Sequence, residues 1–530
     1  MLYSVYRYSQ DTLKECFVNA LADRHEHIVE NKQHLTCLTN YFDKIKTQTI
    51  IVEQEYVNRD FLEDYSSYYV RSYTEYRRNC HRLHFFKNQF SERDFDDLLR
   101  GDKVELSAES LQDNYQGYMV LKPLPTTIIG RTCLVTYPGE GKRHFPAIRK
   151  YAVSLYGINL EVESLAYQEQ DSIVSACASS AIWSVFHGTG KMFQHRIPSP
   201  VEITKWATKY FPFSNRHFPN QGLTGEQMAL AIREVGLEPY LYNVDDIDTL
   251  KATVYAYLKG RIPLVLGFSL FDVINGEAKP RGGHAVAICG FCTGGEVSNT
   301  YRSIEGLQLS ASRIDKLYVH DDQIGPFAKM ETDGVLKIEN KDFPALKTTW
   351  PSGGEDFEFM LGIPQILIIP LYHKIRIPLE KVQSSTNSFN RLCLLINDLH
   401  EQQRLRPVLP RFEWDIHLIT ISDFKHSIFS NSQLAGEYKV SILTQRLPKY
   451  LWRAAAIIKG QPVFEFLMDA TDIDQGTFFI GKIIYDPVFD TLLSTYLNLF
   501  DVSEEMDMTY VDMVKSFGNS SKKAPGAQGK

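Results

Sequence analysis

Residue types that together perform nucleophilic catalysis occur in order along the middle of the chain. Cys177 begins a run of small and apolar residues, His284 lies in the segment Arg-Gly-Gly-His-Ala-Val-Ala-Ile, and Asp321 and Asp322 follow further on. A thiolate attacks carbonyl carbon, an imidazole takes and returns the proton, and a carboxylate fixes the imidazole tautomer. These side chains would form a complete thiol nucleophile if the fold brought them together.

Cys177 is the expected nucleophile because it stands at the start of a predicted helix, residues 177–186, which Gly188 is expected to end. The N-terminus of a helix carries a partial positive charge that favours a thiolate. The structural alternative is a cysteine that only packs in a core of small side chains. The partners of Cys177 decide between the two.

His284 is the expected general base. The glycines before it allow close backbone approach, and it opens the predicted strand 284–288. Asp321 and Asp322 directly follow the predicted strand 316–320. Alternation along a strand would send their side chains to opposite faces, so only one could orient the imidazole. We favour Asp321, and the structural alternatives are a core histidine and an acidic turn.

A glutamine upstream of Cys177 is the expected oxyanion donor. Gln168 and Gln170 both lie within ten residues of the cysteine. A side-chain amide there could donate to a developing oxyanion beside the Cys177 backbone N–H. Gln170 is preferred, and Gln168 remains open.

The surrounding segments predict a helical half followed by a sheet half. Ser199 to Glu202 and Thr224 to Gln227 each form a capping box that opens a helix, and residues 247–258 predict another helix. The apolar runs that follow predict strands at 263–268, 284–288 and 316–320. Packing of one half on the other would place the candidate side chains at a cleft.

The order of these motifs resembles papain-like cysteine peptidases, and most closely the bacterial double-glycine leader peptidase-like branch. The resemblance rests on Gln170 before Cys177, then Leu-Thr-Gly-Glu-Gln-Met, Pro-Leu-Val-Leu-Gly-Phe, Gly-Gly-His-Ala-Val-Ala-Ile-Cys-Gly-Phe and Leu-Tyr-Val-His-Asp-Asp, over about 180 of the 530 residues. It implies a Cys177, His284 and Asp321 triad with Gln170 in the oxyanion hole, and cleavage of amide bonds. The whole chain resembles uncharacterised bacterial proteins with such a core between extra domains.

Two departures from that family keep other functions open. Asp171 stands six residues before the cysteine, where the papain spacing has glutamine, and Cys-Ala-Ser-Ser replaces the common Cys-Gly pair. The leading hypothesis is a cysteine peptidase or isopeptidase. The alternatives are a catalytically silent peptidase-like module that binds or regulates, and a transglutaminase-like acyl transferase.

The expected fold class is α+β, with a papain-like helical half and antiparallel sheet half flanked by additional α+β domains. With 530 residues, 44% of them hydrophobic, the chain is long enough for several domains. The predicted divisions are an N-terminal domain at 1–160, the papain-like domain at 161–350, a C-terminal domain at 356–517 and a disordered tail at 518–530. Ser352 to Asp356 predict the linker.

Composition bears on partners and location. The net charge of −7 is not gathered into blocks, which disfavours nucleic acid as a partner. Eight scattered cysteines and the absence of a signal-like or membrane-spanning segment predict a cytoplasmic protein. Cys289 and Cys292 have C-x-x-C spacing without a second pair, so we expect no metal and no cofactor. The expected partners are a protein or peptide substrate and a regulatory protein.

Overall fold

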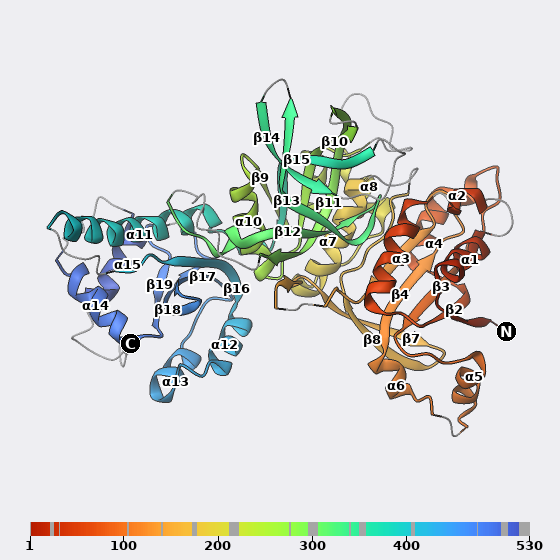
Figure 1. The fold of residues 1–530 in the computed structure, drawn as a ribbon, viewed down its shortest axis with the longest axis horizontal. Coiled ribbons are helices and arrows are strands. Elements are labelled where there is room, and N and C mark those ends of the chain that lie inside the picture. The colour runs from red at the N-terminus through yellow and green to blue at the C-terminus, as the bar shows by residue number, and fades with distance from the viewer. Residues whose placement is uncertain are drawn as a thin grey trace. The chain divides into compact units, whose positions relative to one another are not determined.

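The computed structural model describes most of the chain (Figure 1). The described residues are 2–21, 26–30, 32–102, 105–138, 141–171, 177–210, 222–274, 277–294, 306–338, 341–348, 357–403, 409–473, 475–499 and 507–518. The predicted linker at 352–356 and the tail beyond Gly518 lie outside them. No helix within these ranges has both the length and the apolar composition needed to cross a bilayer.

The chain forms two compact units, and helices and antiparallel sheets are mixed in both. The first unit takes residues 1–247, 261–295 and 314–370, and the second takes 248–260, 296–313 and 371–530. The α+β class expected from the sequence is therefore seen. Residues on both sides of position 160 belong to the same unit.

The N-terminal part of the first unit is built on a five-stranded antiparallel sheet in the order β1-β2-β3-β4-β5. Its elements are β1 (Tyr3–Arg7), α1 (Gln10–Leu21), α2 (Glu26–Glu30), α3 (Gln33–Ile45), β2 (Thr49–Tyr56), α4 (Arg59–Ser67), a 3-10 turn (Tyr69–Arg71), β3 (Cys80–Phe86), α5 (Glu92–Arg100), α6 (Ala108–Asp113), β4 (Tyr115–Leu121), β5 (Ile129–Leu134), β6 (Arg143–His144), β7 (Arg149–Leu155) and β8 (Ile158–Ser164). Strands β7 and β8 pair as a separate hairpin.

The predicted helix at 247–258 belongs to the second unit. The remainder of the first unit contains the other predicted helices and the predicted strands. Its elements are α7 (Cys177–Phe193), α8 (Pro200–Ala207), α9 (Gly225–Glu234), β9 (Glu238–Asn243), β10 (Leu264–Ile274), β11 (Glu277–Thr293), β12 (Ile314–Asp321), β13 (Gly325–Ile338), β14 (Lys341–Thr348) and β15 (Phe357–Leu371). Strands β10 to β15 pair in sequence order, and β15 also pairs with β10. Six antiparallel strands therefore close into a ring.

Local sequence explains where the helices of this part begin and end. Ser199 and Thr224 each open a helix. Both bonds of the predicted capping box are made at α9, whereas at α8 only the bond from the Ser199 backbone N–H to Glu202 is made. Gly236, with φ of +83°, follows the end of α9 in the left-handed region that glycine adopts without strain. Both predicted helix starts are confirmed, as is the change from helical to strand structure after residue 260.

Helix α7 is longer than the sequence predicted. It continues through Gly188 to Phe193, so the expected end at Gly188 is wrong. The glycine serves packing instead, because a Cβ atom there would lie 2.8 Å from Cγ of Pro263 at the entry to β10. Ala178, Ile182 and Trp183 of α7 share a core cluster with β10 and β11, so the helix packs on the sheet as expected.

The second unit packs helices on a four-stranded antiparallel sheet in the order β16-β17-β18-β19. Its elements are α10 (Ile247–Lys259), a 3-10 turn (Ser310–Arg313), α11 (Leu379–Gln402), β16 (Glu413–Thr420), α12 (Ile421–Ser430), α13 (Gly436–Thr444), β17 (Tyr450–Ile458), β18 (Gln461–Asp469), β19 (Phe479–Ile484), α14 (Pro487–Leu497) and α15 (Met508–Gly518). Phe389, Trp414, Phe464, Phe466 and Phe517 stack in its core.

Replacing Gly188 with alanine tests the packing of α7 against Pro263. Overpacking is expected to cost on the order of 1–3 kcal/mol of unfolding free energy, which the better helix propensity of alanine offsets by roughly 1 kcal/mol. Gly283→Ala is the control, because its added Cβ atom meets nothing within 4 Å. Denaturant unfolding measures both. Equal stability of the two variants would contradict the close approach at Gly188.

Candidate active site

His284 is held rigidly at the point where β11 enters the protein interior. Residues 281–283 of the strand are exposed, whereas His284 is only 5% exposed. Strand pairing sets it opposite Phe268 of β10, and the two rings meet edge to face with centroids 5.4 Å apart. The strand begins at Glu277, earlier than the sequence predicted. The imidazole therefore has a fixed position in an apolar wall.

Asp321 is the direct partner of that imidazole. It is the last residue of β12, and its Oδ1 atom lies 3.0 Å from Nε2 of His284. The same oxygen accepts a hydrogen bond of 2.9 Å from the backbone N–H of Gln323, which closes the turn after the strand. A carboxylate held on two sides fixes the ring orientation and keeps a proton on Nε2.

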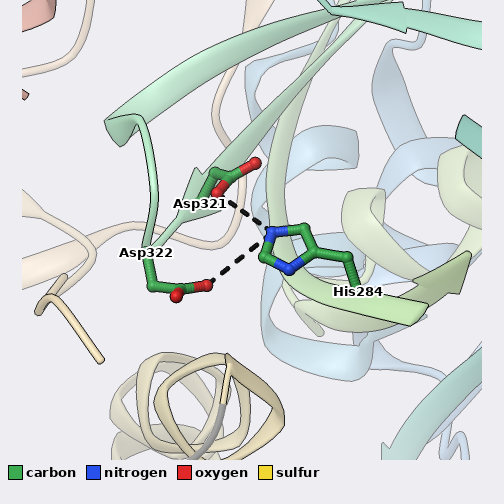
Figure 2. A group of neighbouring side chains, drawn as sticks. All are labelled: His284, Asp321 and Asp322. Atoms are coloured by element: carbon green, nitrogen blue, oxygen red, sulfur yellow. Dashed lines mark hydrogen bonds and ion pairs between the residues drawn. The ribbon is translucent and has the colours of Figure 1, made fainter. Parts of the chain in front are cut away.

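Asp322 faces the same ring nitrogen, contrary to the expectation that it would point to the opposite face. Its Oδ1 atom lies 3.7 Å from Nε2 of His284, and Figure 2 shows both carboxylates turned toward that nitrogen. Alternation does not apply because β12 ends at Asp321 and the chain turns at Asp322. The preference for Asp321 stands on distance, since only that carboxylate is within hydrogen-bonding range of the ring.

Cys177 completes the group from the other side. It is the first residue of α7 and is partly exposed, and its side chain is close enough to His284 to contribute to the raised pKa of the imidazole. Because Nε2 faces the carboxylates, Nδ1 is the nitrogen left for the thiol, and Figure 2 shows it turned away from both acids. Three predicted residues from α7, β11 and β12 thus lie next to one another.

The electrostatics of the group favour a charged imidazole. Burial opposes the imidazolium form of His284, but Asp321, Cys177 and Asp322 raise its pKa, and the net pKa lies well above the ordinary value. Burial raises the pKa of Asp322 to about 7, and the neighbouring Asp321 adds to that effect. A neighbouring imidazole and a helix N-terminus are both features that favour thiolates in proteins.

Helix α3 supports the acidic turn, a contact that the sequence analysis missed. Nε2 of the buried His34 donates a hydrogen bond of 2.8 Å to the carbonyl oxygen of Asp322. Burial lowers the pKa of His34, so the neutral ring is favoured. The pairing joins residues 288 positions apart. Nothing in the local pattern around His34 indicates it, because a histidine on a helix is common in any core.

The two candidate glutamines do not enter the described contacts of Cys177 or His284. Gln168 is buried and Gln170 is half-buried, in the segment that follows β8. Glu169 between them donates its backbone N–H to the carbonyl oxygen of Ile129 and ion-pairs with Lys32. Residues 172–176, which link this segment to Cys177, lie outside the described residues. The oxyanion role of Gln170 stays a prediction.

The same three side chains also offer ligands of the kind that bind a divalent metal. One ligand atom each from His284, Asp321 and Asp322 lies within 4.8 Å of the others. A nitrogen and carboxylate oxygens suit zinc. However, a metal there would displace the hydrogen bond between His284 and Asp321, so the group can serve as a metal site or as a triad but not as both at once. The C-x-x-C pair lies within β11, as the packing interpretation predicted.

Comparison with known proteins adds no assignment. Neither protein-family models nor curated proteins match this chain.

Asp322→Asn tests the buried pair of carboxyl groups through the pH dependence of stability. A carboxyl group with a raised pKa stabilises the fold when protonated and loses that contribution as pH rises through about 7. Asparagine stays neutral, so the unfolding midpoint of the variant relative to the parent should rise by on the order of a few degrees from about pH 5 to about pH 8.5. Glu105→Gln, at an exposed position, is the control. A difference that does not change with pH would contradict a raised pKa.

Proposed function

We propose that this protein is a thiol hydrolase, a cysteine peptidase or isopeptidase with a papain-like middle region, that cleaves amide bonds in a protein or peptide. The observation that carries the proposal is the position of Cys177 beside His284, whose imidazole is hydrogen-bonded to Asp321. If Cys177 and His284 had only packing roles, there would be no reason for the cysteine, the histidine and a carboxylate to lie next to one another in this order. The closed ring of antiparallel strands beside α7 also fits the helical and sheet halves of a papain-like fold.

The proposed reaction uses one thiol and one proton carrier. The Cys177 thiolate attacks the amide carbonyl carbon and forms a carbon–sulfur bond, and the imidazolium of His284 gives its proton to the leaving amine as the carbon–nitrogen bond breaks. Neutral His284 then takes a proton from water, whose oxygen displaces sulfur and releases the carboxylic acid. Asp321 holds the ring and stabilises its charged form in both steps.

The oxyanion of each tetrahedral intermediate needs hydrogen-bond donors. Cys177 is at the first position of α7, where backbone N–H groups lack partners within the helix. Its own N–H is therefore one proposed donor, and the side-chain amide of Gln170 is the second. Gln168 remains the alternative to Gln170.

The cysteines bear on the cellular compartment of the reaction, and the parts of the chain outside the papain-like region bear on its substrate and regulation. All eight cysteines are free thiols, as expected for a protein of a reducing compartment such as the cytoplasm. We assign the N-terminal part and the second unit to substrate choice or to regulation by a partner protein. Nucleic acid is not among the proposed partners.

Alkylation of Cys177 by iodoacetamide tests the proposed function directly. In the native protein, Cys177 should react faster than free cysteine because its thiolate is stabilised by His284. His284→Ala should slow the reaction, and Asp321→Asn should slow it by roughly tenfold for each pKa unit by which the imidazolium is destabilised. Peptide mass spectrometry measures the rate at each cysteine separately.

Cys292 is the internal control in every sample. It is also half-buried, but burial raises its pKa and no histidine faces it in the described structure. Its alkylation should be slow and should not change in the His284 and Asp321 variants. If Cys177 reacted no faster than free cysteine, or if the variants slowed both cysteines equally, the activated thiol would be excluded.

Product analysis separates hydrolysis from acyl transfer and from a silent module. Incubation with a proteome-derived peptide mixture should produce new carboxyl termini that depend on Cys177 and are absent with Cys177→Ala. Added ethanolamine should appear on few of them, because water is the proposed acceptor. Predominant ethanolamine adducts would favour a transferase. No difference between the parent and Cys177→Ala would favour a module without turnover.

A further inference from the structure

A pocket separate from the thiol lies between α3 and the start of β13. Its volume is about 350 Å³, within the lower range of small-molecule sites. The lining residues come from α3, from the segment after β5 and from the turn between β12 and β13; they are Cys37, Leu38, Asn40, Tyr41, Tyr137, Ile324, Gly325, Pro326, Ala328 and Lys329. Neither Cys177 nor His284 is among them.

Lys329 lines this pocket, and Lys44, which is not a lining residue, approaches the same tyrosine ring beside it. The ammonium of Lys329 lies 5.0 Å from the ring centroid of Tyr137, and that of Lys44 lies 5.3 Å from the same centroid. The two side chains are close enough to lower the pKa of Lys329, after burial as the larger cause. Like charges in contact repel, so this arrangement is costly unless something of opposite charge lies between them.

Within the described ranges, no carboxylate forms an ion pair with either Lys44 or Lys329. Arg143 and Lys316 also contribute to the lowered pKa of Lys329, so further cations lie near this lysine. Lys316 differs because Glu331 pairs with it at 3.2 Å. Among the residues whose positions are described, Lys44 and Lys329 are therefore two neighbouring cations without an ion-pair partner.

The rest of the pocket is suited to a flat apolar group. Tyr41 and Tyr137 contact each other edge to face, with centroids 5.4 Å apart, and both line the cavity. Leu38, Ile324 and Pro326 add aliphatic surface. Aromatic and aliphatic walls with a small number of placed charges are typical of sites for organic ligands.

We propose that this pocket binds a small aromatic phosphate monoester of the size of a nucleoside monophosphate. The phosphate would lie between the ammonium groups of Lys44 and Lys329, where its charge of about −2 matches the two cations. The aromatic part would lie against Tyr41, Tyr137 and the aliphatic wall. The site does not depend on the proposed thiol chemistry, because no residue of the triad lines it.

Calorimetric titration of the full chain with AMP, GMP, CMP and UMP tests the proposal. At least one of these should bind with a dissociation constant below about 1 mM. Its nucleoside alone and inorganic phosphate alone should each bind more weakly, because each lacks half of the recognised chemistry. Lys329→Gln and Lys44→Gln should each weaken binding by roughly tenfold.

Lys316→Gln is the matched control, since it removes a nearby lysine that already has a carboxylate partner. It should leave binding unchanged. Equal loss in all three lysine variants would indicate only a general charge effect and would overturn the site. No binding of any of the four nucleotides, or inorganic phosphate binding as tightly as the nucleotide, would overturn the assigned ligand class.

Discussion

The hydrogen bond between His284 and Asp321 is the interaction on which the candidate site depends. An imidazole and two carboxyl groups are all buried there, and an unpaired charge in that position would be costly. The burial of these groups is tolerated because the imidazole of His284 faces the carboxyl groups of Asp321 and Asp322. The mutual dependence also fixes the geometry, since β11 and β12 must pair in the observed register for the end of β12 to reach the ring. Sheet pairing therefore creates the site, and the site in turn constrains the sheet.

Sequence patterns identified those parts of the site that are determined locally. Capping residues set α8 and α9, and apolar runs set the positions of β10, β11 and β12. Patterns failed where a distant contact decided the outcome. Gly188 lies inside α7 and does not end it. A glycine is needed there because Pro263 leaves no room for a Cβ atom.

The support from α3 is the largest feature that the sequence did not indicate. His34 bonds to the backbone of the acidic turn, and Cys37 on the same helix is near enough to Asp321 for that carboxylate to contribute to the raised pKa of the thiol, after burial. A turn that carries two buried acids has few ways to satisfy its own carbonyl groups. A helix contributed by the N-terminal part provides that partner, which explains why this part and the sheet ring share a core cluster.

The departure at Asp171 also has a structural reason. Its side chain is 2% exposed, and its Oδ2 atom accepts a hydrogen bond of 2.7 Å from the hydroxyl of Tyr69. A carboxyl group lacks the N–H donors of a glutamine amide, so Asp171 does not offer the oxyanion donor that a glutamine would have at that position. The buried position is instead used to connect the N-terminal part to the segment before α7. A side-chain donor to the oxyanion would therefore have to come from another residue, and the half-buried Gln170 is the residue proposed for that role.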